Sequence, residues 1–166
     1  MRTSVDVHNH LVDRGVRHEL LPLRGRLRSA ERIAAVLGLP PAVVGKVVVF
    51  ETDRGPVAAL VPSSRDADPK RVRRAVRASE IHAASPAKAS QLSEYLFEAI
   101  PPVGLPPSFR VVMDRDLASE EVLYFAGGEA TAILKVRAQD LAGAAGAKVA
   151  PIGTGPGETG PSPGGP

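Results

Sequence analysis

The sequence contains no cysteine and no tryptophan, and it has only four phenylalanines and two tyrosines. Without cysteine the chain can form no disulfide, cysteine-ligated zinc site, iron–sulfur cluster or thiol nucleophile. With so few aromatic side chains, the sequence does not indicate a platform on which nucleic-acid bases stack. These absences exclude several whole classes of function.

Long apolar runs are also missing. The first ten residues are polar and charged, and they lack the apolar segment of a secretory signal. No apolar run approaches the length of about 20 residues that a membrane-spanning helix needs. We therefore expect a cytoplasmic protein without a membrane partner.

The remaining composition suits one globular domain. Hydrophobic residues make up 43% and charged residues 23% of the 166 positions. Glycine and proline account for 11 of the 16 residues from Pro151 to Pro166. This predicts a folded domain over residues 1–150 and a Gly/Pro-rich disordered tail over residues 151–166. The net charge of +3 permits an anionic partner without requiring one.

Hydrophobic patterning predicts alternating helices and strands. Asp68-Pro69 and Ser85-Pro86 are typical helix starts, and Ser29 is placed to cap a helix that ends at Gly38. The predicted helices cover 3–15, 29–38, a segment from 69, 86–97 and 139–141. The predicted strands cover 16–23, 46–51, 57–61, 109–113, 122–126 and 131–136. Strands joined mostly by hairpins indicate an α+β fold with a largely antiparallel sheet, which is either open or curled into a barrel.

Motifs for metal or nucleotide chemistry are not evident. His8 and His10 are two residues apart, so on one helix they do not share a face, and we expect no metal site. The phosphate-binding G-x-x-x-x-G-K-[ST] loop is absent. The strings that match G-x-G-x-x-G and G-x-S-x-G, at 155–160 and 160–164, lie in the Gly/Pro-rich tail, outside the predicted strands and helices that these motifs require. A Ser-His-Asp triad is not ruled out by residue types alone.

Two basic features each leave two interpretations open. Lys70, Arg73, Arg74 and Arg77 share one helical face, which is either a solvated surface or a strip that contacts phosphates. Lys46 stands at the head of an apolar strand. It is either an exposed strand end or an ammonium group that anchors an anionic or carbonyl ligand.

The order of these features resembles the YbaK/prolyl-tRNA-synthetase-associated family of aminoacyl-tRNA editing domains. The resemblance begins with two helices and the strand 45–50, which reads GKVVVF. The later landmarks are a strand that ends in Asp at 111–114, a Gly-containing hairpin at 125–136 and a helix at 139–141. The resemblance covers residues 3 to 142, and it rests on order and spacing more than on any single motif.

The resemblance implies a mixed sheet curled into a barrel-like core with flanking helices. It also implies a deacylase that hydrolyses the ester of mischarged tRNA in trans, without a metal or cofactor. Lys46 matches the lysine on which the family depends, and it is expected to position the acceptor end of the tRNA. The substrate-binding residues implied are Glu98, Ala99, Pro102, Gly104, Asp114 and Gly127. Arg73 and Arg77 are expected to contact tRNA phosphates, and an aminoacyl-tRNA synthetase is a further possible partner.

The sequence departs from the family pattern at residues 93–104. Tyr95, Pro102 and Gly104 keep their places, but Glu94 and Glu98 stand where the family has glycine. Glu98 either binds the α-ammonium of a different aminoacyl group or blocks the pocket. In the second case the chain is a non-catalytic module that binds tRNA or a synthetase. A small-molecule-binding domain unrelated to tRNA is a third interpretation.

Overall fold

The fold is built around a hairpin of two long strands. In the computed structural model, which describes residues 1–154, β2 (Gly45–Thr52) pairs antiparallel with β3 (Gly55–Pro62). The β-branched run in β2 favours a strand. Gly55 closes the turn with a φ of 105°, a conformation that side chains rarely adopt. The predicted hairpin is confirmed.

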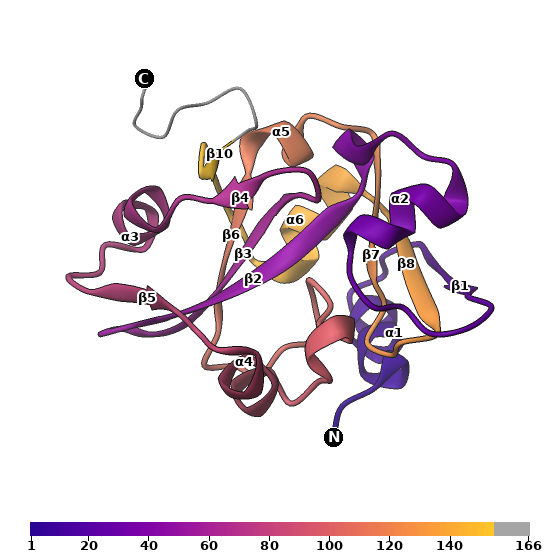
Figure 1. Cartoon of the computed structure of the whole chain (residues 1–166), viewed down its shortest axis with the longest axis horizontal. Coiled ribbons are helices and arrows are strands. Elements are labelled where there is room, and N and C mark those ends of the chain that lie inside the picture. Colours follow the sequence, from indigo (N-terminus) through magenta and orange to yellow (C-terminus); the bar gives the residue numbers. More distant parts are fainter. Residues whose placement is uncertain (155–166) are drawn as a thin grey trace.

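This hairpin forms the centre of a five-stranded mixed sheet in the order β5-β2-β3-β6-β9 (Figure 1). β5 (Ile81–Ala83) pairs antiparallel with β2. On the other side, β6 (Arg110–Asp114) pairs parallel with β3, and β9 (Lys148–Ala150) pairs parallel with β6.

A second, antiparallel sheet has the order β1-β8-β7. Its strands are β1 (His18–Pro22), β7 (Val122–Ala126) and β8 (Ala132–Arg137). A bridge between Val44 and Tyr124 joins the two sheets. Within residues 1–154 no sheet closes on itself. The mixed α+β fold is therefore confirmed, whereas the barrel-like curl is not.

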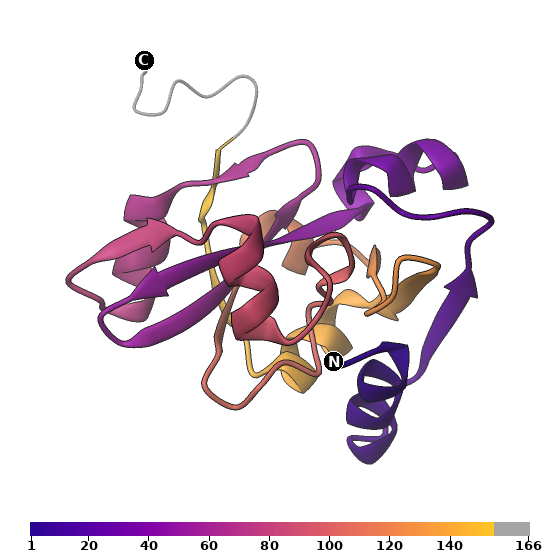
Figure 2. The same cartoon turned by 60° about the horizontal axis from the view of Figure 1, so that its bottom comes forward.

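Helices cover the sheets, and Figure 2 brings α4 and the loop after it to the front. The α-helices are α1 (Ser4–Asp13), α2 (Glu31–Leu37), α3 (Pro69–Val76), α4 (Pro86–Ser93), α5 (Arg115–Ala118) and α6 (Ala138–Ala145). Two short 3₁₀ helices are η1 (Pro41–Val43) and η2 (Phe97–Ala99).

Local capping explains where several helices begin. Asp68 accepts a hydrogen bond from the Lys70 N–H at 2.9 Å, and Ser85 accepts one from the Lys88 N–H at 3.2 Å. The prediction that Ser29 caps the helix ending at Gly38 was wrong. The N-cap position of α2 is occupied by Ala30, and no side chain forms a capping hydrogen bond there. α4 also ends earlier than predicted, at Ser93.

The two faces of β2 pack against different parts of the core. Val49 belongs to the cluster that includes Leu11, Leu134 and residues of α6, whereas Phe50 packs with Val72 and Val76 of α3. A third cluster joins α2 to the smaller sheet and contains Ile33, Val44 and Ile133. Burying one such side chain contributes about 1.5–3 kcal/mol to stability. The sheet thus separates α3 from the cluster that contains Val49.

The packed chain continues past the predicted boundary at residue 150. Ile152 is fully buried, and β10 (Gly153–Thr154) pairs antiparallel with β4 (Asp66–Ala67). The rest of the predicted tail, residues 155–166, lies outside the described residues. In the described part, no helix is both long and apolar enough to cross a bilayer.

Candidate functional site

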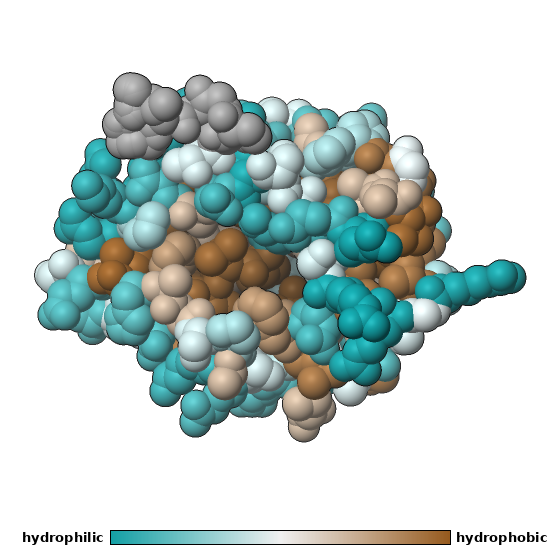
Figure 3. Space-filling model, in the orientation of Figure 1, coloured by the Kyte–Doolittle hydropathy of each residue, from teal (hydrophilic) through white to brown (hydrophobic). Residues whose placement is uncertain are grey.

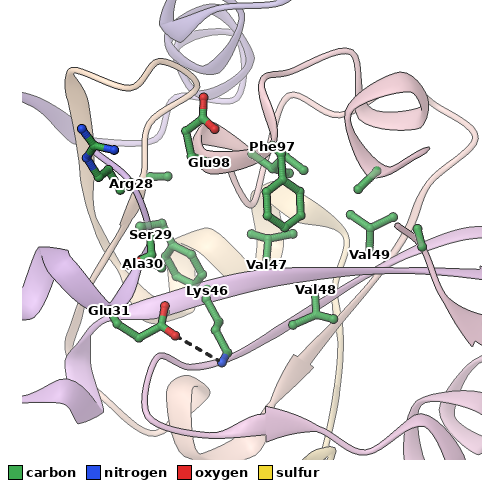
Figure 4. Close-up of a pocket in the computed structure, with 16 residues that line it drawn as sticks. Arg28, Ser29, Ala30, Glu31, Lys46, Val47, Val48, Val49, Phe97 and Glu98 are labelled. Atoms are coloured by element: carbon green, nitrogen blue, oxygen red, sulfur yellow. Dashed lines mark ion pairs between the residues drawn. The ribbon is translucent and has the colours of Figure 1, made fainter. Parts of the chain in front are cut away.

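The first half of β2 forms one wall of a pocket of about 350 Å³. The floor is apolar, because it contains Val47, Val49, Ile100 and Phe125, while charged side chains stand at its edges (Figure 4). Its remaining lining residues are Arg28, Ser29, Ala30, Glu31, Gly45, Lys46, Val48, Ala84, Ala89, Phe97, Glu98 and Ala126. Apolar side chains gather at the centre of the face that carries β2, and hydrophilic ones surround them (Figure 3).

Gly45 allows this wall to form. A Cβ placed on Gly45 would lie 2.1 Å from Cζ of Phe125, which is far inside contact distance. The glycine therefore lets the Phe125 ring lie against the start of β2 and become part of the pocket. This gives a packing reason for the Gly45-Lys46 pair that the sequence analysis singled out.

Lys46 lies on the pocket wall with its side chain 19% exposed. Successive strand residues point to opposite faces, and Lys46 is directed to the other side of β2 from Val47 and Phe97 (Figure 4). Its Nζ lies 3.5 Å from Asp66 Oδ1 and 3.9 Å from Glu31 Oε2. The ammonium group is thus at the edge of the pocket, between two carboxylates.

Glu98 stands at the opposite edge of the pocket, on η2. Its Oε1 accepts a hydrogen bond from Nη2 of Arg26 at 3.0 Å. Because most of the Arg26 side chain is exposed, this ion pair can exchange with other charged groups. Lys46 and Glu98, predicted from distant parts of the sequence, therefore line one pocket.

Phe97 is a lining residue that the sequence analysis did not identify as a site residue. Its side chain is half exposed although it is large and apolar, and it stands over Val47 (Figure 4). The sequence analysis placed Phe97 at the end of a helix over 86–97. Because α4 ends at Ser93, Phe97 instead belongs to η2 and lines the pocket. Arg26, Arg28 and Glu31 were also missed, since no sequence signal distinguishes them from ordinary surface charges.

The structure places Pro102 and Gly104 in a different pocket, of about 500 Å³, which Arg2 and His10 also line. Gly104 has a φ of 74°, and its carbonyl accepts a hydrogen bond from the Tyr95 hydroxyl at 2.8 Å. A Cβ on Gly104 would lie 2.9 Å from that hydroxyl oxygen. Burial raises the pKa of Tyr95 above its ordinary value. Tyr95 and Gly104 thus hold the 95–104 loop together.

Ala99 and Gly127 lie beside lining residues rather than among them. Ala99 is fully buried, and its carbonyl accepts a hydrogen bond from the Gly128 N–H at 3.0 Å. Gly127 donates to the Ala132 carbonyl at 2.9 Å, and a Cβ there would lie 3.0 Å from Leu20. The Ala99–Gly128 hydrogen bond thus connects η2 to the β7–β8 hairpin, whereas the hydrogen bond of Gly127 lies within that hairpin.

Asp114 is buried at the end of β6, away from the pocket that contains Lys46. Its carboxylate accepts hydrogen bonds from the N–H groups of Asp116, Ile152 and Gly153 at 2.8–3.1 Å. Three donors satisfy the buried charge, so the observed contacts of Asp114 are structural.

Arg73 and Arg77 lie on and just after α3, which packs on the other face of the larger sheet from Val49. α3 ends at Val76, and Arg77 adopts a left-handed conformation with a φ of 57°. Neither residue lines the pocket that contains Lys46.

One histidine of the described chain contacts a carboxylate, since His82 Nε2 lies 3.1 Å from Glu51 Oε2. His8 Nδ1 lies 3.0 Å from His18 Nε2, and His18 Nδ1 donates to the Val16 carbonyl at 2.9 Å. Residues 1–154 contain no group of three or more His, Cys, Asp or Glu side chains placed to hold a metal ion.

Comparison with known proteins identifies the family to which the pocket belongs. Residues 25–144 match the family model described as the aminoacyl-tRNA editing domain. All residues that line the pocket, from Arg28 to Ala126, fall inside this range. No curated protein matches the chain.

Solved structures share the fold over nearly the whole chain. Hypothetical protein APE2540 has a TM-score of 0.84 and 26% identity, with 90% of this chain and 99% of that chain covered. A candidate trans-editing enzyme for prolyl tRNA synthetase has a TM-score of 0.81 and 25% identity, with 92% and 97% covered. A candidate signal transduction protein from Marinobacter aquaeolei VT8 has a TM-score of 0.65 and 15% identity, with 95% and 31% covered, which shows the fold alone.

Proposed function

Because the chain belongs to the aminoacyl-tRNA editing domain family, we propose that it is a deacylase that hydrolyses the ester of mischarged tRNA in trans, in the cytoplasm. One observation supports this most directly. Within the matched segment, one pocket combines an apolar floor with Lys46 on one edge and Glu98 on the other. The aminoacylated terminal nucleotide of a tRNA has an amino-acid side chain that suits the floor, an α-ammonium group that suits Glu98 and a phosphate that suits Lys46.

The reaction breaks the ester bond between the amino-acid carbonyl carbon and a ribose oxygen. Water supplies a hydroxyl to the carbonyl carbon and a proton to the ribose oxygen, so the products are a free amino acid and a tRNA with its terminal hydroxyl restored. The attacking group is a positioned water, or a substrate hydroxyl followed by water, and backbone N–H groups stabilise the oxyanion. No step requires a metal or cofactor.

Lys46 is proposed to hold the acceptor end of the tRNA. Its present partners are exposed, since the Asp66 and Glu31 side chains are 89% and 57% accessible. Exposed ion pairs contribute only about 0–1 kcal/mol. A phosphate can therefore replace these carboxylates at Nζ, which would fix the ester over the pocket.

Glu98 is proposed to bind the α-ammonium group of the aminoacyl moiety in exchange for Arg26. The other implied residues act indirectly in this proposal. Ala99 and Gly127 shape the wall through their neighbours, and Pro102, Gly104 and Asp114 maintain the loop and strand end that support it.

A second candidate is a non-catalytic module that binds tRNA or a synthetase. The observation that favours it is the Arg26–Glu98 ion pair at the edge of the pocket, where the family has glycine. If this pair blocks the pocket, Glu98→Gly will create or increase hydrolysis. If Glu98 binds substrate, Glu98→Gly will reduce it.

A deacylation panel tests the proposal. The purified chain is incubated with tRNAs mischarged with alanine, cysteine and serine, and with a correctly charged tRNA as the control. We expect rapid release of the amino acid from at least one mischarged tRNA and slow release from the control. No release from any of them, together with salt-sensitive tRNA binding, would support the non-catalytic module. Ligand binding that is indifferent to salt, without tRNA binding, would instead favour a small-molecule-binding domain.

A further inference from the structure

Four cationic side chains surround the end of α3, far from the pocket that contains Lys46. Arg54, Arg77, Arg110 and Lys148, here called the basic cluster, line a surface pocket of about 510 Å³. All four residues are exposed. They come from the β2–β3 turn, the end of α3, and the starts of β6 and β9, so only the folded chain brings them together.

Three members of the basic cluster donate hydrogen bonds to backbone carbonyls in the last turn of α3 or directly after it. Lys148 Nζ donates to the Ala75 carbonyl at 2.9 Å. Arg110 donates to Val76 at 3.2 Å, and Arg54 donates to Arg77 at 3.3 Å. Cations at the end of a helix satisfy its unpaired carbonyls and offset its dipole. Each guanidinium has five N–H donors, so these contacts leave most of its donors available.

The positive charge far exceeds what capping the helix requires. The carboxyl end of a helix dipole is equivalent to roughly half a negative charge, whereas the basic cluster carries four positive charges. In the described chain, none of the four forms an ion pair with a carboxylate.

One acidic group nearby, Asp53, offsets part of this excess, because its carboxylate attracts the Arg54 guanidinium. Asp53, beside Arg54, accepts hydrogen bonds from the N–H groups of Glu80 and Ser79 at 2.9 and 2.8 Å. The hydrogen bond from Glu80 is the main reason that the pKa of Asp53 lies below its usual value. Asp53 and Glu80 are both exposed and lie outside the lining of the cluster pocket.

The position of the basic cluster determines which part of an RNA could reach it. β2 extends from the pocket at Lys46 to Thr52, just before Arg54, a distance of about 20 Å at 3.3 Å per residue. That distance corresponds to roughly six nucleotides along one strand of a duplex. Phe109 is the only aromatic residue among the lining residues, so the surface is suited to phosphates rather than to stacked bases.

We propose that the basic cluster is a second RNA-binding surface, which contacts backbone phosphates of the double-helical part of the tRNA while its acceptor end occupies the pocket. The inference rests on the proposed function, and it assigns tRNA affinity to a surface separate from the pocket. Arg74, exposed on α3 and without an ion pair in residues 1–154, extends the same positive surface.

The test compares two triple variants with equal changes in charge. Arg54→Gln, Arg110→Gln and Lys148→Gln remove three charges from the basic cluster and retain hydrogen-bond donors. The matched control carries Arg14→Gln, Arg17→Gln and Arg137→Gln, three exposed arginines outside the cluster. Circular dichroism and thermal unfolding verify that both variants fold.

The first readout is the affinity for uncharged tRNA over a range of salt concentrations. We expect the cluster variant to bind at least about tenfold more weakly near 0.1 M salt. The slope of the logarithm of its binding constant against the logarithm of salt concentration should fall in magnitude by about 2–3, because up to three phosphate contacts are lost. The control should retain its affinity and slope. An unchanged affinity and slope in the cluster variant would overturn the proposal.

The second readout is deacylation of a full-length tRNA and of a short aminoacylated oligonucleotide that contains only the acceptor end. We expect a higher KM for the tRNA and unchanged kinetics for the oligonucleotide. An equal loss on both substrates would overturn the proposal. If neither substrate is hydrolysed by the wild-type chain, the proposed function fails, while the binding readout still decides the role of the basic cluster.

Discussion

At the scale of single residues, the contacts separate side chains that face the pocket from those that support the fold. Lys46 and Glu98 both line the pocket, which the resemblance to the family could predict from two motifs. The direction of Lys46 and the partner of Glu98 could not be predicted, because both depend on charges from other segments, namely Asp66 and Arg26.

We expect Glu98→Gln to reduce the preference of the enzyme for a free α-amino group. A hydrogen bond to a charged group contributes about 1.5–3 kcal/mol, or roughly a tenfold to hundredfold effect on kcat/KM. The measurement compares aminoacyl-tRNA with its N-acetylated form. Glu94→Gln serves as the control, because Glu94 caps α4 outside the pocket. An equal loss on both substrates would contradict the role of Glu98.

Tyr95 predicts a specific dependence of stability on pH. Burial raises its pKa in the folded state, so the folded state retains the hydroxyl proton after the unfolded chain, with a pKa of about 10, has lost it. The contribution of the Tyr95 hydroxyl to the free energy of unfolding is therefore fully present below pH 10 and is lost as the pH rises above 10. Urea unfolding at pH 7, 9 and 11 should show a smaller alkaline loss in Tyr95→Phe than in the wild type. Parallel profiles would contradict this account.

At the scale of elements, long patterned segments could be predicted and short ones could not. The β2–β3 hairpin and the capped starts of α3 and α4 follow from local chemistry. β4, β5, β9 and β10 have only two or three residues each, too few for a periodic pattern, and their partners are distant in sequence. The early end of α4 arises at Glu94, whose φ of 68° is typical of glycine.

Gly45→Ala tests whether packing of β2 against Phe125 forms the pocket. The added methyl would overlap the ring, so we expect a loss of about 1–3 kcal/mol in the free energy of unfolding and a lower deacylation rate. Gly143→Ala is the matched control. No atom lies within 4 Å of its Cβ position, and alanine in helix α6 should stabilise by about 0.5–1 kcal/mol. Equal stability of the two variants would contradict the packing argument.

At the scale of the whole molecule, the sequence predicted the α+β class but not the point at which the packed chain ends. The Gly/Pro-rich composition placed the boundary at residue 150, yet composition does not show that Ile152 enters the core beside α3. Nor can it show that the N–H groups of Ile152 and Gly153 satisfy the buried carboxylate of Asp114. Such long-range pairing depends on the assembled sheet.

Comparing chains that end at Ala150 and at Thr154 tests this boundary. The shorter chain loses the buried Ile152 side chain, which lowers the free energy of unfolding by about 2–5 kcal/mol. It also leaves the Asp114 carboxylate without two of its hydrogen-bond donors. We expect its Tm to be lower by roughly 10 °C or more in thermal unfolding. Equal Tm values would show that residues 151–154 do not contribute to the core.

The central claim is that ester hydrolysis occurs in the pocket beside Lys46. The most direct measurement is the single-turnover rate of deacylation of the preferred mischarged tRNA by the wild type and by Lys46→Met. Lys135→Met is the control, because Lys135 also pairs with a carboxylate from a strand but lies outside the pocket. We predict a loss of roughly tenfold to hundredfold for Lys46→Met and none for the control. A folded Lys46→Met protein that hydrolyses the tRNA as fast as the wild type would contradict the claim.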